Sequence, residues 1–183
     1  MTEKIELATT VLILPQRQTV LVAKQVAQLA VLSNNRFRLG IGVGWNKIEY
    51  EGLNETFENR GRRQEEQVMV MRDLWTQDSL DFEGEFHRID KASINPRPEE
   101  SIPIWFGGSA PALIERVARL GDGWMPLMGA NEKAAECIRK IREAREREGK
   151  NMDGFGIQAQ AQYNGGTPDT VSYTHLTLPT SVT

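Results

Sequence analysis

The stretch IPIWFGGSAPALIERVARLGDGW, residues 102–124, decides the fold of this chain. It opens with a short apolar run of the length of a buried strand, passes through Gly107, Gly108 and Ser109, and continues with a helical pattern over residues 111–120. A proline in the first turn and a glycine after the last turn mark the ends of that helix. A buried strand followed directly by a helix is the repeating unit of a parallel α/β fold.

The same strand-and-helix unit recurs on both sides of this stretch. Short apolar runs predict five parallel strands, over residues 5–14, 37–43, 102–106, 124–127 and 155–161. Regular alternation of strands and helices implies right-handed crossovers and a parallel sheet. Five strands do not close an eight-stranded barrel. The periodicity therefore leaves two architectures open, a doubly wound open sheet and a barrel that lacks both ends.

Apolar residues at helical spacing predict which helix faces point inward. A first helix starts at Thr19 and stops at Ser33, with apolar spacing at Val20, Ala23, Ala27, Ala30 and Val31. The inward stripe of a second helix is Val68, Met71, Leu74 and Trp75. A helix over residues 131–148 turns inward Ala134, Ala135, Ile138 and Ile141. Alternating charges over residues 139–150 predict a solvated face on that last helix.

Residues 79–98 interrupt the alternation. Short alternating apolar residues around Glu83-Gly84-Glu85 predict a hairpin inserted between two barrel units. His87 lies in this hairpin, and a lone histidine there is expected at the surface. Three arginines before the hairpin are expected to fix the adjoining helix by ion pairs with acidic residues. These are Arg60, Arg62 and Arg63, with Glu65 and Glu66 among the expected partners.

The composition favours a small-molecule partner. A formal net charge of −3 and a pI near 5.5 make nucleic acid and an anionic membrane unfavourable partners. The single cysteine, Cys137, cannot form an internal disulfide, and no signal-peptide pattern or membrane-length apolar run is present. We therefore expect a cytoplasmic protein. No metal-ligand spacing, Ser-His-Asp arrangement or catalytic carboxylate pair is found, so no metal is expected.

Residues 171–180, VSYTHLTLPT, fit nothing before them, because they carry no charge and no helical pattern. The codons GTC TCT TAT ACA CAT CTG ACG CTG CCG ACG encode these residues, and that string is the transposase adapter used to build sequencing libraries. We therefore expect the natural sequence to stop at about Thr170. Residues 1–170 then form one barrel domain, and residues 171–183 are a translated artefact. A native polar tail is the alternative.

Five stretches resemble the luciferase-like oxidoreductase superfamily, and most of all its actinobacterial-type deazaflavin-dependent branch. They are LATTVLILPQR (7–17), LGIGVGWNKIEY (39–50), RGRRQEE (60–66), IPIWFGGSAPALIERVARLGDGW (102–124) and GTPDT (166–170). Their order and spacing also match. The resemblance implies a partial TIM (β/α)₈ barrel with about five of the eight strands. By that comparison the chain begins just before the third barrel strand and ends just before the seventh helix.

The resemblance also implies an activity. Members of this superfamily are oxidoreductases or monooxygenases that hold FMN or the deazaflavin coenzyme F-420 and act on small organic substrates. Because the cofactor does the redox chemistry, no protein nucleophile is required. A homodimer is one option for the intact parent, the longer protein of which this chain is expected to be a part. A non-catalytic cofactor-binding barrel is the alternative function. This chain as cut is also expected to expose unpaired barrel edges, which would leave it inactive.

The loop Gly107-Gly108-Ser109 is the first predicted cofactor contact. It follows a buried strand and opens a helix, so free backbone N–H groups and the positive end of the helix face one point, which suits a phosphate. Ser109 is expected to cap the helix and to donate its hydroxyl. An ordinary tight turn is the alternative. The resemblance implies that this loop holds the flavin's phosphate, and that Trp124 packs beside the cofactor tail.

The glycines of residues 40–44 are the second predicted contact. Their GxGxG pattern lacks the last spacing of the dinucleotide-binding fingerprint and lies within a strand, so that interpretation is rejected. Gly42 and Gly44 are instead expected to leave space for a flat ring system, with Trp45 and Asn46 at its rim. The alternative is that these glycines merely fit the packing of the barrel.

The third predicted contact lies on the preceding strand. There the resemblance implies a bulge with a non-proline cis peptide against the cofactor ring, at the bond from Thr10 to Val11. Glu49 lies one helical turn beyond Trp45 and is a weak candidate for a general base or a substrate contact. A solvated glutamate is its alternative, so the catalytic residues stay unknown.

Overall fold

The computed structural model describes residues 2–126, 128–129 and 131–159. The chain forms two compact units, Met1–Trp105 and Phe106–Thr183. Within the described residues, no helix has the length and apolar character needed to cross a membrane. The predicted adapter tail and the GTPDT stretch lie outside the described residues, and so do Leu127 and the end of the predicted strand over residues 155–161.

The first unit is built on parallel strands with a break in the first of them. β1 (Leu7–Ala8) and β2 (Leu12–Ile13) both pair in parallel with β3 (Phe37–Gly42). The sequence predicts one strand over residues 5–14, whereas the structure interrupts it between β1 and β2. At the break, the hydroxyl of Thr9 donates to the carbonyl of Gly40 at 2.8 Å and accepts from the Gly40 N–H at 2.9 Å. One side chain thus replaces the missing backbone ladder.

The predicted burial of the first strand is wrong at its beginning. Ile5 is 61% exposed and Leu7 is 41% exposed. Apolar composition predicts a strand but not what covers its faces, and no described element covers this end of β1. The strand after it, β3, is buried as predicted and ends one residue earlier than expected.

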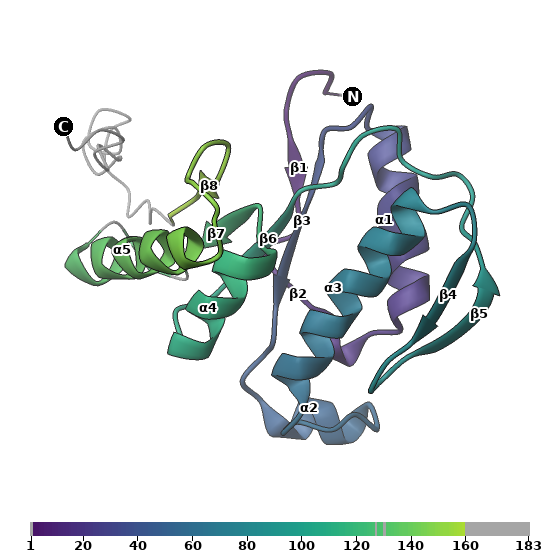
Figure 1. Cartoon of the computed structure of the whole chain (residues 1–183), viewed down its shortest axis with the longest axis horizontal. Coiled ribbons are helices and arrows are strands. Elements are labelled where there is room, and N and C mark those ends of the chain that lie inside the picture. Colours follow the sequence, from purple (N-terminus) through teal and green to yellow (C-terminus); the bar gives the residue numbers. More distant parts are fainter. Residues whose placement is uncertain (1, 127, 130, 160–183) are drawn as a thin grey trace. The chain divides into compact units, whose positions relative to one another are not determined.

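Two long helices lie side by side on one face of these strands (Figure 1). The predicted stripe on α3 (Arg60–Thr76) is confirmed, because all four of its residues are buried. The stripe on α1 (Thr19–Leu32) is only partly confirmed, since Val20 and Val31 are exposed by 40% and 43%. Val22 and Val26 are buried instead, because they lie at the centre of the face of α1 that is turned toward the rest of the first unit.

Three shorter elements complete the first unit. The antiparallel hairpin of β4 (Leu80–Glu83) and β5 (Arg88–Ala92) confirms the predicted insertion. A 3₁₀ turn, η1 (Leu14–Gln16), follows β2, and a short helix, α2 (Lys47–Gly52), lies where the sequence pattern indicates a polar loop. Six residues are too few to show a hydrophobic period, so α2 leaves no pattern of its own.

The strand β6 (Ile104–Gly107) begins in the first unit and ends in the second, two residues later than predicted at its start. The second unit continues with α4 (Pro111–Leu120), β7 (Gly123–Met125), α5 (Glu132–Arg147) and β8 (Gly156–Ile157). β7 and β8 pair in parallel, and α4 packs against α5. With β1 and β2 counted as one interrupted strand, five strand positions alternate with helices. This confirms an α/β fold that forms part of a (β/α)₈ barrel.

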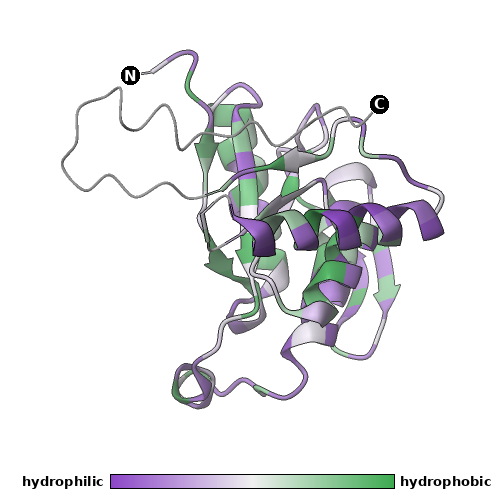
Figure 2. Ribbon diagram, turned by 90° about the vertical axis from the view of Figure 1, so that its left-hand side faces the viewer, coloured by the Kyte–Doolittle hydropathy of each residue, from purple (hydrophilic) through white to green (hydrophobic). Residues whose placement is uncertain are grey.

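The last helix departs from its prediction at two positions. Figure 2 shows α5 as mostly hydrophilic, as its alternating charges predict. Ala135 is exposed although it was expected to point inward, and Cys137 is buried in its place. Arg145 is buried within the face expected to be solvated. Its guanidinium donates to the carbonyls of Asn151 at 2.7 Å and Gly121 at 3.3 Å, which is what makes burial of the charge tolerable.

Candidate functional site

The break between β1 and β2 contains the predicted cis peptide. The bond from Thr10 to Val11 is cis, so that prediction is confirmed. Thr10 is exposed and Val11 is half-buried. The bridge from Thr9 to Gly40 holds this segment against β3, so Thr10 and Val11 lie at a fixed place beside the end of that strand.

The structure brings the glycines of β3 together with the cis peptide. A Cβ atom added at Gly42 would lie 2.8 Å from Cγ2 of Val11. One added at Gly44 would lie 3.0 Å from Cγ2 of Ile13, and φ at Gly44 is +70°. The space that these glycines leave is therefore occupied by Val11 and Ile13. These contacts agree with the packing interpretation of the two glycines.

Glu49 and Trp45 lie just beyond these glycines. Trp45 is 86% exposed, as expected for a rim position. The Glu49 carboxylate accepts hydrogen bonds from Nε2 of Gln16 at 3.3 Å and from Nδ2 of Asn46 at 3.2 Å. Asn46 also caps α2 by accepting from the N–H of Ile48. Two amide side chains thus orient Glu49, and Gln16 comes from the turn that follows β2.

Tyr50 is a residue of this region that the sequence analysis did not identify. It is fully buried, its hydroxyl donates to the carbonyl of Val43 at 2.5 Å, and its ring meets Phe57 edge-on at 5.4 Å. Burial raises the pKa of Tyr50 to about 12, although Arg60 and Arg63 act in the opposite direction. Tyr50 therefore fastens the segment after β3 in its protonated form.

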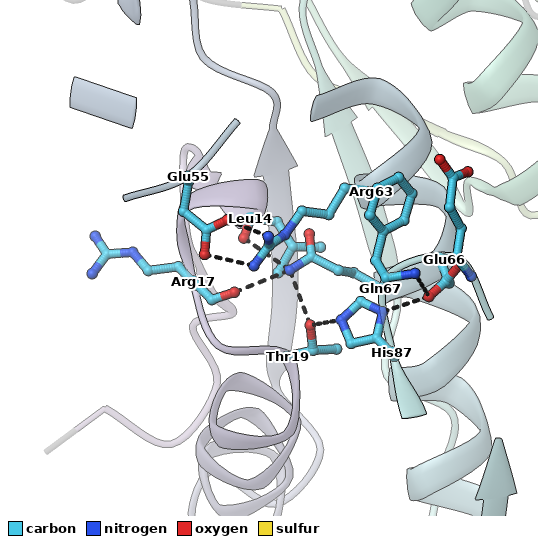
Figure 3. A network of polar contacts seen from close by, with 10 residues as sticks. Leu14, Arg17, Thr19, Glu55, Arg63, Glu66, Gln67 and His87 are labelled. Atoms are coloured by element: carbon cyan, nitrogen blue, oxygen red, sulfur yellow. Dashed lines mark hydrogen bonds and ion pairs between the residues drawn. The ribbon is translucent and has the colours of Figure 1, made fainter. Parts of the chain in front are cut away.

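A buried polar network ties the hairpin to the turn after β2 (Figure 3). Oγ1 of Thr19 lies 2.6 Å from Nε2 of His87, and Nδ1 of His87 lies 2.7 Å from Oε1 of Glu66. The side chains of His87 and Glu66 are only 13% and 9% exposed, so the expected surface position of His87 is wrong. The sequence shows His87 on a hairpin but not that the hairpin folds against α3.

The arginines near the start of α3 find other partners than the sequence indicates. Arg62 pairs with Glu85 at 2.6 Å, and Arg63 pairs with Glu55. Arg60 donates to the carbonyl of Phe57. The prediction that these arginines form ion pairs is confirmed for Arg62 and Arg63, but their partners, Glu85 and Glu55, lie outside α3. Local spacing favours partners on the same helix, whereas the fold brings closer carboxylates from the loop and the hairpin.

In the second unit, the loop Gly107-Gly108-Ser109 makes a sharp turn from β6 into α4. Gly108 has φ of +118°, a conformation that residues with a Cβ rarely adopt. Its N–H donates to the carbonyl of Met125 at 3.2 Å, and its carbonyl accepts from Nε1 of Trp124 at 2.7 Å. The N–H of Gly108 is therefore not a free donor. Trp124 is fully buried and supports this loop.

The N-terminus of α4 keeps the properties expected of an anion site. Ser109 is not its cap as predicted, because the cap position is Ala110 and no side chain closes it. Within the described residues, the N–H groups of Ser109, Ala110 and Ala112 find no acceptor, and the first turn holds no acidic residue. Pro111 lacks an N–H and stands at the first helical position, as predicted. Three unpaired donors at the positive end of a helix suit a phosphate.

No group of three metal-ligating side chains that could hold an ion occurs within residues 2–126, 128–129 and 131–159. The candidate site of the first unit therefore consists of the cis peptide, the glycines of β3, Trp45 and Glu49. That of the second unit consists of the loop before α4 and Trp124.

Comparison with known proteins agrees with these features. A family model described as "Luciferase-like monooxygenase" matches residues 1–164. An uncharacterized protein of Mycobacterium tuberculosis is 38% identical over 80% of this chain. A protein of Mycolicibacterium gilvum named F-420-dependent glucose-6-phosphate dehydrogenase is 33% identical over the whole chain. The chain spans 54% and 57% of the length of these two relatives.

Among solved structures, the coenzyme F-420-dependent tetrahydromethanopterin reductase of Methanopyrus kandleri superposes with a TM-score of 0.76. It is 18% identical, and the superposition covers 88% of this chain and 51% of the reductase. At that identity the likeness speaks for the fold alone. It agrees with the strand and helix alternation of a partial barrel.

Proposed function

The chain belongs to the luciferase-like monooxygenase family, and on that premise we propose that its parent is an oxidoreductase that binds FMN or coenzyme F-420. The proposed reaction is hydride transfer or monooxygenation of a small organic substrate. The observation that carries the proposal is the set of unpaired N–H donors at the start of α4. A relative named as an F-420-dependent dehydrogenase supports the same cofactor class.

The loop before α4 fits the phosphate end of such a cofactor. Its N–H donors lie at the N-terminal end of a ten-residue helix whose first turn has no acidic side chain. Gly108 has no side chain that would block the approach of a phosphate to the backbone. We assign Gly107, Gly108 and Ser109 to this contact. Trp124 donates its indole N–H to the Gly108 carbonyl, which fixes the loop from behind.

The residues of the first unit are proposed to contact the ring of the cofactor. Thr10 and Trp45 are exposed and lie next to the packed positions Val11, Gly42 and Gly44. A rigid backbone beside exposed side chains can orient a flat ring without moving when it binds. We therefore propose that Thr10 and Trp45 contact the ring, and that Val11, Gly42 and Gly44 form the packed backbone that holds them in place.

When bound, a flavin or deazaflavin supplies the redox chemistry, and the protein's part is binding, orientation and exclusion of water. The chain's candidate for holding a proton is the Glu49 carboxylate. Its two oxygens are oriented by Gln16 and Asn46, and it is exposed enough to meet a substrate.

The test is a titration of FMN and of coenzyme F-420, each into the chain and into two variants of Ala112. Ala112→Asp places a carboxylate in the first turn of α4, which stabilises the helix but repels a phosphate. We expect it to raise the dissociation constant about tenfold or more, because hydrogen bonds to a charged group are weakened or lost. Ala112→Asn is the matched neutral control and should bind nearly as wild type.

The two effects of Ala112→Asp have opposite signs, so damage to the fold cannot imitate the result. The melting temperature should stay unchanged or rise slightly while the affinity falls. Equal affinity in all three proteins would place the phosphate elsewhere. A wild-type chain or full-length parent that binds neither compound would contradict the proposed function itself.

A further inference from the structure

We propose that Gln67, Thr19, His87 and Glu66 form a positioning relay that holds the turn of residues 14–19 and, through it, the carboxylate of Glu49. The inference rests on the proposed function, because it assigns these residues to the support of that site. None of the four touches the candidate ring contact. They act through the turn that follows β2 (Figure 3).

Gln67 is the member of the relay that contacts the turn directly. It is fully buried, and its two N–H groups are shared among three acceptors around Nε2: the carbonyl of Leu14 at 3.2 Å, that of Arg17 at 3.1 Å and Oγ1 of Thr19 at 3.0 Å. One amide group thus gathers three acceptors from both ends of the turn. A buried amide held this way fixes the position of the turn relative to α3.

His87 connects Thr19 to Glu66 through its two ring nitrogens. Oγ1 of Thr19 accepts from Nε2 of Gln67 and lies 2.6 Å from Nε2 of His87. On the other side of the ring, Nδ1 lies 2.7 Å from Oε1 of Glu66, so an N–H at Nδ1 donates to this carboxylate. The imidazole thus bridges the hydroxyl of Thr19 and the carboxylate of Glu66.

Glu66 anchors the far end of the relay in the hairpin turn. Its carboxylate accepts from the N–H of Glu85 at 2.7 Å and from that of Phe86 at 2.8 Å. A Cβ added at Gly84 would lie 2.5 Å from Cδ of Glu66, so the turn wraps closely around the carboxylate. The hairpin therefore has a fixed seat on α3 and presents His87 to Thr19.

The relay reaches the candidate site through Gln16. This residue lies within the held turn, between the two carbonyls that Gln67 contacts, and donates to Oε2 of Glu49 at 3.3 Å. A shift of the turn would move Gln16 away from Glu49. The hairpin, which the sequence shows only as an insertion, thus acquires a role in keeping Glu49 oriented.

Thr19 is the position at which the relay can be cut with little change of shape. Thr19→Val removes the hydroxyl and keeps the branched side chain, whereas Thr19→Ser keeps the hydroxyl. Arg62→Ala is the matched control, because it deletes the exposed pair with Glu85, which also joins the hairpin to α3 but does not reach the turn.

The first measurement is tryptic cleavage after Arg17 in the chain without cofactor, with the site identified by mass spectrometry. We expect Thr19→Val to raise the cleavage rate about tenfold, because local opening of the turn costs less once its hydrogen bonds are lost. Thr19→Ser and Arg62→Ala should be cleaved at the wild-type rate. Equal rates in Thr19→Val and wild type would overturn the relay, whatever the cofactor turns out to be.

The second measurement is turnover by the full-length parent with the cofactor that binds. A positioning role predicts that Thr19→Val lowers kcat about tenfold with little change in the cofactor dissociation constant, and that Thr19→Ser restores kcat. Faster cleavage at Arg17 with unchanged kcat would reduce the relay to a structural strap and overturn its positioning role. Absence of cofactor binding in wild type would instead contradict the proposed function and leave the cleavage result standing.

Discussion

The glycines at the end of β3 and the glycine after β6 serve two different physical needs. Gly42 has no room for a Cβ, because Val11 lies 2.8 Å from where that atom would be. Gly108 has room, since its nearest neighbour in the same test is Leu113 at 3.4 Å, but its φ is +118°. The first glycine is required by space and the second by backbone conformation. Glycine-rich motifs of similar appearance can therefore fail in different ways when mutated.

The largest effect is expected where space is the constraint. Gly42→Val would add three carbon atoms next to Val11, and we expect a loss of about 3 kcal/mol in the free energy of unfolding. Urea unfolding measures it. The smaller change Gly42→Ala should be largely rescued by Val11→Ala in a double-mutant cycle. Additive losses in that cycle would show that Val11 is not the obstacle.

A somewhat smaller effect is expected where conformation is the constraint. Gly108→Ala should cost about 2 kcal/mol, because a residue with a Cβ is strained at this φ whatever space surrounds it. Truncating the neighbour should not help, so Leu113→Ala combined with Gly108→Ala should be no more stable than the sum of the two predicts. Rescue of Gly108→Ala by Leu113→Ala would remove the distinction between the two regions.

The side-chain hydrogen bonds that support the two regions should follow the same order, with the larger loss of stability in the first region. Thr9→Val leaves both the N–H and the carbonyl of Gly40 without their partner, so we expect a loss of about 2 kcal/mol. Trp124→Phe leaves only the carbonyl of Gly108 without its donor and should cost about 1 kcal/mol beyond the lost packing area. Thermal unfolding of both variants under one condition tests the order. A larger loss in Trp124→Phe, after the contribution of the lost packing area is subtracted, would reverse it.

A further effect should appear only in alkali and only through the first region. The pKa of Tyr50 is raised to about 12 by burial, against an unfolded value of about 10. Folding stability from this group is therefore complete below about pH 10 and is lost as the pH rises toward 12. Tyr50→Phe should flatten this part of the stability profile. An unchanged alkaline slope in Tyr50→Phe would assign the slope to other groups.

Regular patterns in the sequence were sufficient for the order of strands and helices, whereas the choice of a partial barrel over an open sheet came from the family resemblance. Apolar runs placed five strands, helical spacing placed the buried stripe of α3, and turn residues placed the hairpin of β4 and β5. The cis bond at Thr10 came from resemblance and not from any local pattern, and it is present. The strands, the buried stripe and the hairpin share a cause, because each is encoded within a few residues of the place where it appears.

Only the tertiary structure decided which polar groups are buried and what they meet. Thr19 and His87 are 68 positions apart, and nothing near either residue indicates their contact. Arg145 lies in a run of charges that predicts a solvated face, yet its guanidinium is buried and donates to the carbonyls of Gly121 and Asn151. Ser109 is a favourable capping residue, but the turn at Gly108 makes Ala110 the cap. Local periodicity reports which face of an element is apolar, whereas a hydrogen bond between distant segments depends on how the elements pack, and that has no local signal.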